Sequence, residues 1–324
     1  DQKIVCMSFQ KFLLKVMKKK INNSLRNLSS LNLKKLIDMG YGDEIMATAF
    51  AKIEKKKYPE RQVVVGDAKA RTAKYSKIYY NNPNISDPRK LDQNKIVHFV
   101  DHNNSNRPYI DWTKSKSGKL CWNINHRAIP GELYFDKQEI NEAENVIKDA
   151  KKFWKTYNSI KNKGIIFIET SRIIKKNFMP KQIYNRNWSP ERWEKTIDIL
   201  KKSYLIVNST HAKSFKHDNI FSYGCEFRVA CAIMKYCDIY LGPEGGFAHA
   251  AAALSKPAVV IFGGWITPKV TGYEFHENLY VDIEGSPCGI RDRECDHCKK
   301  CMDLITVDNV VNAVERNINK KFNY

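Results

Sequence analysis

The segment from Asp238 to Gly264 constrains the fold of this chain more than any other part of its sequence. An apolar run ends in a glycine-rich turn, an alanine-rich stretch follows, and a second apolar run covers residues 258–263. Short apolar runs bounded by turn residues are typical of strands that are buried on both faces of a sheet. The order therefore predicts a strand, a helix and a second, parallel strand, with Ala250–Ala253 allowing close contact between helix and sheet.

The turn in this segment, Gly242-Pro243-Glu244-Gly245-Gly246, indicates a ligand-binding loop. Glycines between a strand and a helix let the backbone approach a ligand closely. The free N–H groups and the dipole at the helix start favour a phosphate. Glu244 can accept hydrogen bonds from sugar hydroxyls, and His249 lies in the first turn of the helix. A tight turn without a ligand is the alternative, but packing alone requires neither of these polar side chains.

A second loop of this kind, Gly40-Tyr41-Gly42-Asp43-Glu44, lies between a predicted strand at 35–40 and a predicted helix at 43–57. Gly40 and Gly42 again permit close approach, and Asp43 would lie at the helix start. Two interpretations are equally good on this motif alone. Asp43 is either a functional carboxylate or an N-cap, which is a common role for Asp.

The remaining pattern predicts an α/β protein with two strand–helix series that join near residue 160. Strands are expected at 62–67, 76–80, 96–101, 164–170, 204–207, 238–242 and 258–263, and helices at about 136–163, 226–236, 247–255 and 307–319. A further helix is expected to begin at Ser189-Pro190, with Ser189 as the N-cap. The predicted domains are residues 33–162 and 163–324, and the second includes a cysteine-rich segment at 288–301.

Residues 1–32 form a separate basic segment in which apolar residues at 9, 12, 13, 16, 17 and 21 have helical spacing. This basic amphipathic helix would suit an anionic membrane surface, and packing on the body of the protein is an equal alternative. The chain has 324 residues and a net charge of +20, which favours an anionic partner of some kind. No apolar run is long enough to span a bilayer.

Together these segments resemble the heptosyltransferase-like glycosyltransferases of family 9, over roughly residues 33–315. The resemblance rests on GDEIMAT in the early loop, NWSPERW at Asn187–Trp193, EFRVA at Glu226–Ala230, and above all GPEGGFAHAAAALSKPAVVIFG. It implies two facing Rossmann-like domains, the B-type glycosyltransferase fold. It also implies inverting transfer of a heptose or hexose from a nucleotide diphosphate donor to a lipopolysaccharide-like or other surface glycan. Such an enzyme would be cytoplasmic or peripheral to the inner face of the membrane.

The resemblance also assigns roles by position. Asp43 would be the general base, with Gly40 and Gly42 in the acceptor-side loop. The donor would be bound by Arg186, which would contact phosphate, and by the loop residues Glu244, Gly245, Gly246 and His249. Family members usually have Asp at the position of Glu244, often Lys at that of Arg186, and G-x-L/I-G-D in the early loop. These departures leave the donor sugar open.

The chemistry requires a carboxylate to remove the proton of the attacking hydroxyl. The growing charge on the leaving diphosphate would be met by the helix start at Gly245 and Gly246 and by Arg186. No convincing D-x-D metal motif is found, so catalysis is expected to need no metal. The aromatic residues Tyr109 and Trp112, in the segment that begins at Arg107, and Trp122 could stack on an acceptor sugar, although core packing is the better interpretation.

Four late cysteines, Cys288, Cys295, Cys298 and Cys301, have the spacing C-x6-C-x2-C-x2-C, with His297 among them. This spacing indicates structural zinc, with reduced or disulfide-linked thiols as an equal alternative. An iron–sulfur cluster is the third and weakest interpretation. The other cysteines are scattered, which favours a reducing compartment over a secreted disulfide framework.

Three other functions compete with sugar transfer. A basic zinc-knuckle protein that binds nucleic acid fits the charge and the cysteines. However, the basic residues are not interleaved with aromatics in a recognisable motif, so no nucleic acid partner is expected. A nucleotide-sugar epimerase of similar fold would share the donor loop but consume no acceptor. A degenerate, non-catalytic family member would show no effect of changing Asp43.

Overall fold

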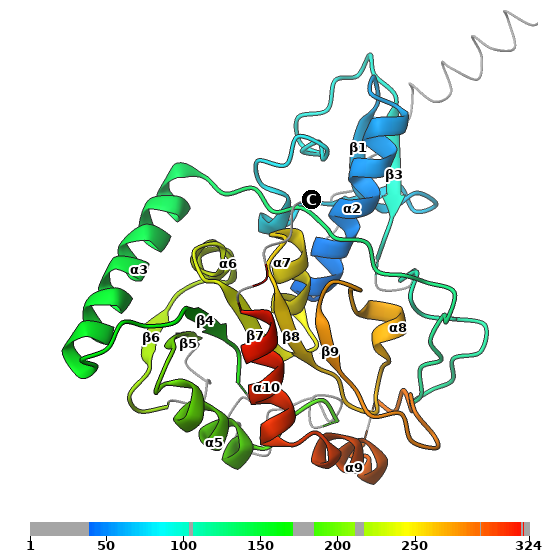
Figure 1. Ribbon diagram of the computed structural model, residues 1–324. Coiled ribbons are helices and arrows are strands. Elements are labelled where there is room, and N and C mark those ends of the chain that lie inside the picture. The colour runs from blue at the N-terminus through cyan, green and yellow to red at the C-terminus, as the bar shows by residue number, and fades with distance from the viewer. Residues whose placement is uncertain are drawn as a thin grey trace, which may run out of the picture.

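The computed structural model describes residues 39–103, 106–170, 185–210, 217–291, 293–318 and 320 (Figure 1). The basic segment predicted at 1–32 lies outside the described residues, as does most of the strand predicted at 35–40. None of the helices in these ranges has the length and apolar character that a membrane crossing requires.

The larger sheet has six parallel strands in the order β6-β5-β4-β7-β8-β9. They are β4 (Ile165–Ile168), β5 (Leu205–Thr210), β6 (Phe221–Gly224), β7 (Ile239–Pro243), β8 (Ala258–Ile261) and β9 (Glu277–Leu279). When its strands are counted along the chain, this sheet has the doubly wound dinucleotide-binding order 3-2-1-4-5-6. The winding direction changes between the first and fourth of these strands, β4 and β7. Ligands of such sheets bind outside the carboxyl ends of the strands at this switch point.

Helices cover both faces of this sheet (Figure 1). Alternate strand residues explain why, because Phe167, Val207 and Val260 are buried on one face, and Ile166, Ile206 and Val259 on the other. The first face packs against α3 (Lys137–Tyr157), α6 (Phe227–Lys235) and α7 (Gly246–Ala253), and the second against α5 (Pro190–Leu200) and α10 (Val307–Asn317). Two short helices complete this part, α8 (Pro268–Thr271) and α9 (Asp296–Leu304).

The smaller sheet has three strands, β2 (Thr72–Lys74), β1 (Gln62–Asp67) and β3 (Val97–Asp101), and helix α2 (Tyr41–Lys57) packs on it. β1 is parallel to β3 and antiparallel to β2. The strand predicted at 76–80 is wrong, since Lys77–Tyr79 is a short 3-10 helix. The Ser76 side chain accepts a hydrogen bond from the Ile78 N–H at 3.1 Å, and such a local bond competes with strand pairing.

Helix α3 was expected to run to residue 163 but ends at Tyr157, followed by Asn158 in extended conformation. It begins as predicted, with Asp136 and Glu139 forming a capping box. α3 packs on β5, β6 and α6 of the larger sheet, and Figure 1 shows it far from β1 and β3. The elements of residues 33–162 therefore do not all pack around the smaller sheet.

One of the buried apolar clusters contains residues from both parts of the molecule. Tyr109 and Trp122, which precede α3, belong to the same buried cluster as Trp265, which follows β8. The Trp122 indole N–H donates to the Trp265 carbonyl at 2.8 Å, and the two rings are edge-to-face at 4.7 Å. Core packing is thus confirmed for Tyr109 and Trp122, whereas Trp112 is 39% exposed.

Candidate active site

The turn after β7 lies at the switch point of the larger sheet. Pro243 ends the strand, and Gly245 is the N-cap of α7. No side chain of the described residues caps this helix. A Cβ built on Gly245 would meet no described atom within 4 Å, so there is open space beside the helix start. This combination can accept an anionic group.

Glu244 and Arg186, both predicted in the donor site, are in direct contact. An Arg186 Nη1 donates to the Glu244 carboxylate at 2.9 Å, and the Thr271 hydroxyl lies 3.5 Å from its other oxygen. The Arg186 guanidinium also lies over the Trp265 ring, 4.7 Å from its centroid. A phosphate entering this site would share Arg186 with Glu244.

His249 faces the early glycine loop from the first turn of α7. A Cβ on Gly42 would lie 2.7 Å from His249 Cδ2 and 3.5 Å from the Gly246 Cα, so only glycine permits this approach. His249 Nδ1 pairs with the Tyr273 hydroxyl at 2.7 Å. Burial lowers the pKa of His249, so its imidazole is neutral at physiological pH.

Asp43 lies in the first turn of α2, and its interpretation as an N-cap is wrong because Gly40 is the N-cap. The buried Asp43 carboxylate accepts a hydrogen bond from the Tyr109 hydroxyl at 2.7 Å. His102 Nε2 lies 3.8 Å from the same oxygen, and Arg107 Nε lies 3.5 Å from the other. Three side chains that follow β3 therefore surround one carboxylate.

The ionisation of Asp43 reflects these contacts. Burial by itself would raise the pKa of the carboxyl, but the contact with His102, the charge of Arg107 and the Tyr109 hydrogen bond together lower it. Asp43 is therefore ionised at neutral pH. Burial lowers the pKa of His249, and the charges of Glu244 and Asp43 both oppose this lowering, so the carboxylate and the donor loop act on the same imidazole.

The lowered pKa of Asp43 predicts how stability depends on pH. The stabilisation by its carboxylate is complete above the unfolded-state pKa, near 3.8, and is lost as the pH falls through the lower folded-state pKa. We expect the difference in free energy of unfolding between wild type and Asp43→Asn to be constant above about pH 5 and to shrink below it. Urea unfolding from neutral pH to about pH 3 measures this. A difference that does not change with pH would contradict the assignment.

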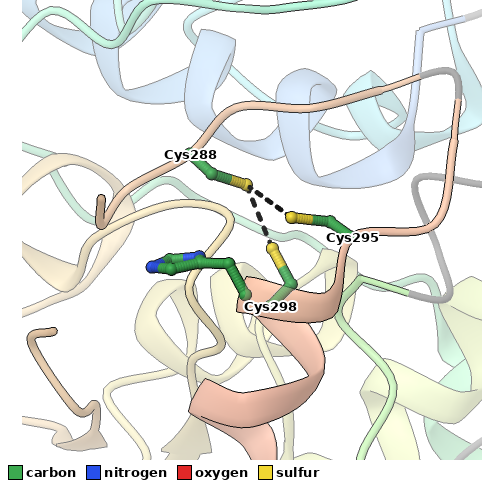
Figure 2. Close-up of side chains that lie close together, drawn as sticks. Cys288, Cys295 and Cys298 are labelled. Carbon is green, nitrogen blue, oxygen red and sulfur yellow. Dashed lines mark hydrogen bonds between the residues drawn. The ribbon is translucent and has the colours of Figure 1, made fainter. Parts of the chain in front are cut away.

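The side chains of Cys288, Cys295 and Cys298 point toward one another in the cysteine-rich segment (Figure 2). The sulfur of Cys288 lies 3.1 Å from that of Cys298 and 3.8 Å from that of Cys295. With His297, the possible ligand atoms lie within 4.8 Å of one another. The hydrogen bond from Cys298 is the largest cause of a lowered pKa at Cys288, which favours the thiolate that metals bind.

The structure places His297, and not Cys301, in this cluster. The Cys301 sulfur lies 3.6 Å from the Ser286 hydroxyl and 3.9 Å from His297 Nε2. His297 Nε2 also pairs with Ser286 at 3.1 Å, while its buried Nδ1 has no hydrogen-bond partner among the described residues. Three thiols and one imidazole nitrogen are a common zinc ligand set, so the residues fit a structural metal.

Sequence reasoning found the two loops but not the residues around Asp43. The sequence pattern indicates sugar stacking or core packing for Tyr109 and assigns no role to Arg107 or His102. The only sequence signal for a functional role of these residues is that Arg107 and Tyr109 lie in a stretch rich in aromatic residues. Nothing in the spacing of His102 connects it with Asp43, which lies 59 residues earlier.

No protein-family model matches the chain, and no curated protein matches it. The solved structure of the family 9 glycosyltransferase from Veillonella parvula DSM 2008 is 13% identical, with a TM-score of 0.54 over 87% of this chain and 95% of that one.

A second solved structure is TibC from enterotoxigenic E. coli H10407, described as an iron-containing dodecameric glycosyltransferase. It is 12% identical, with a TM-score of 0.54 over 87% of this chain and 76% of that one. TibC in complex with ADP-D-beta-D-heptose gives a TM-score of 0.51 at 13% identity, covering 86% and 74%. At these identities the likeness establishes the fold, and the predicted B-type glycosyltransferase fold is confirmed.

Proposed function

We propose that this protein is an inverting glycosyltransferase that takes its sugar from a nucleoside diphosphate donor. The observation that carries the proposal is the meeting of two loops. The open helix start at Gly245 lies at the switch point of the larger sheet, and the ionised Asp43 directly follows Gly42, which lies against His249 and Gly246. A carboxylate base and an anion site are thereby combined at the junction of the two sheets.

Transfer would proceed by a single displacement. An acceptor oxygen attacks the anomeric carbon while its proton passes to the Asp43 carboxylate. The bond from that carbon to the diphosphate oxygen breaks, and its electron pair leaves with the nucleoside diphosphate. The start of α7 and Arg186 meet this negative charge, so we expect the transfer itself to need no metal. Attack from the face opposite the leaving group inverts the anomeric centre.

The donor is expected to be a nucleotide-activated heptose or hexose. An ADP-sugar has the best support, because a protein of this fold has been solved with ADP-D-beta-D-heptose. In this assignment Glu244 accepts hydrogen bonds from donor hydroxyls and Arg186 contacts phosphate. An epimerase using the same donor loop would turn over nucleotide sugar without an acceptor, so acceptor dependence separates the two functions.

The acceptor is expected to be a lipopolysaccharide-like or other surface glycan, bound on the side of the smaller sheet. The basic sequence of residues 1–32 supports a cytoplasmic enzyme that contacts an anionic membrane. Nucleic acid is not favoured as the partner. The Cys/His cluster packs into the core of the larger-sheet part of the molecule instead of forming a separate small zinc domain.

Changing Gly245 to Trp should abolish nucleotide binding without unfolding the protein. Its extended backbone (φ 160°, ψ −162°) accepts any residue, and the indole would fill the open space that the diphosphate requires. Titration calorimetry with ADP, UDP, GDP and CMP measures the loss, and the melting temperature reports folding. Gly245→Ala is the matched control, which we expect to retain most of the affinity. Unchanged binding in Gly245→Trp would place the nucleotide elsewhere.

The Cys288/Cys295/His297/Cys298 cluster is proposed to hold one structural metal ion, zinc or iron. The metal would fix this segment of the fold, with no step of the transfer at the metal. We expect Cys298→Ser to lose the metal and Cys301→Ser to retain it, as measured by metal analysis of purified protein. Loss in Cys301→Ser with retention in Cys298→Ser would restore the four-cysteine set that the spacing suggested.

A further inference from the structure

Asn185 connects the cysteine-rich segment to the proposed donor site. Its side chain is 2% exposed, and its Oδ1 accepts a hydrogen bond from the Cys295 N–H at 2.9 Å. Its Nδ2 donates to the carbonyls of Ile290 at 3.1 Å and Arg293 at 3.2 Å. The buried amide is therefore used entirely on one segment that lies more than a hundred residues later in the chain.

The side chain of the next residue, Arg186, contacts Glu244 and Trp265 in the donor site. The Trp265 indole N–H donates to the Ile290 carbonyl at 2.8 Å. The Gly289 N–H donates to the Trp265 carbonyl at 3.1 Å. The Asn185 side chain, next to Arg186 in the chain, and the ring beneath the Arg186 guanidinium are thus anchored to the same segment, residues 289–295.

These anchoring residues lie between two members of the metal cluster. Ile290 and Arg293 are flanked by Cys288 and Cys295, and Cys295 contributes its sulfur to the cluster and its backbone N–H to Asn185. A metal bound by both cysteines would fix both ends of this stretch. Metal ligands and the groups that hydrogen-bond to them hold one another in position. Without the metal, the sulfurs are held together only by weak S–H contacts.

We propose that Asn185 is a positioning residue that couples metal occupancy of the cluster to the placement of Arg186, so that the metal tightens donor binding. The donor part of this inference rests on the proposed function. The metal acts at a distance from the transfer, through three hydrogen bonds of one amide. Substituting Asn185 should therefore uncouple the two sites while leaving the metal in place.

The experiment compares zinc-loaded and chelator-treated protein in wild type and Asn185→Ala. Hydrogen exchange over residues 186–189 reports the backbone next to Asn185 without any nucleotide. ADP titration reports the donor site, and metal analysis reports occupancy. In the wild type we expect zinc to protect residues 186–189 and to tighten ADP binding about tenfold, the effect expected from a few hydrogen bonds. Asn185→Ala should bind zinc and show neither response.

Two further variants keep the outcome interpretable. Asn185→Asp preserves the acceptor for Cys295 and loses the donors to Ile290 and Arg293, so we expect an intermediate response. Asn317→Ala removes an equally buried amide on α10, 3% exposed, and should respond to zinc as the wild type does. If Asn185→Ala is too unstable to purify, Asn185→Asp carries the comparison.

A wild-type response to zinc in both Asn185 variants overturns the coupling, as does loss of zinc from either, because Asn185 would then serve only the cluster. Tight ADP binding that is independent of zinc and Asn185 leaves the proposed function intact and removes this inference. If zinc protects residues 186–189 from hydrogen exchange but ADP does not bind, the coupling between the cluster and this segment stands, and the assignment of an ADP-sugar donor is wrong.

Discussion

Asp43→Asn is expected to lower kcat for sugar transfer by about a hundredfold to ten-thousandfold, the usual contribution of a general base. The amide has nearly the shape of the carboxylate but cannot accept the acceptor's proton. Nucleotide affinity should change little, because the diphosphate is bound by the start of α7 and Arg186 rather than by Asp43. Initial rates with ADP-heptose and a surface glycan acceptor, together with ADP titration, measure the two effects separately.

Asp87→Asn is the matched control for this prediction. Asp87 also belongs to the first half of the chain and has a lowered pKa, mainly because its side chain pairs with Arg89, but it touches none of the residues around Asp43. We expect it to retain wild-type rates. Transfer by Asp43→Asn at the wild-type rate would remove Asp43 as the base and would fit a protein in which this carboxylate only stabilises the fold.

Arg228→Met is expected to give the largest loss of stability, about 3–5 kcal/mol in the free energy of unfolding. Arg228 on α6 is 5% exposed and donates to both oxygens of Glu139 on α3, at 2.6 Å each. It also donates to the Tyr134 carbonyl at 2.7 Å and to the Lys77 carbonyl at 2.9 Å. Removing it leaves the half-buried Glu139 carboxylate without its cationic partner, with the Asp136 N–H still donating to it at 2.9 Å, and removes the hydrogen bonds from α6 to Lys77 and Tyr134.

Urea unfolding of Arg228→Met measures this loss. The matched control is Glu226→Gln, which breaks the ion pair between Lys77 and Glu226 over the same junction. Those side chains are 59% and 71% exposed, so water screens the pair and we expect no measurable change. Equal effects in the two variants would show that burial does not determine the strength of this junction.

The sequence predicted the elements that contain long apolar runs. β7, α7 and β8 lie within two residues of their predicted limits, because both faces of the strands are buried and the glycine turn marks the helix start. β9 and α8 were not predicted, since they have only three and four residues and carry too little periodicity. The strand predicted at 76–80 failed because the Ser76 hydroxyl closes a local turn.

The candidate site could be predicted only as far as loop chemistry determines it. Glu244, Gly245 and Asp43 follow from their positions between a strand or loop and a helix. The contacts of Tyr109 and His102 with Asp43 depend on how the stretch after β3 folds back over α2, which no short-range pattern encodes. Likewise, spacing could not choose between His297 and Cys301, because the choice depends on which side of α9 faces Cys288.

The most direct test of the proposed function is the structure of the protein bound to ADP. The diphosphate should lie at the start of α7 beside Gly245, within hydrogen-bonding distance of backbone N–H groups and of Arg186. The open face of this site should lead to the Asp43 carboxylate. ADP bound away from this turn, for example in the groove along α3 lined by Lys137, Glu142 and Tyr223, would contradict the donor site, as would a failure to bind at saturating ADP.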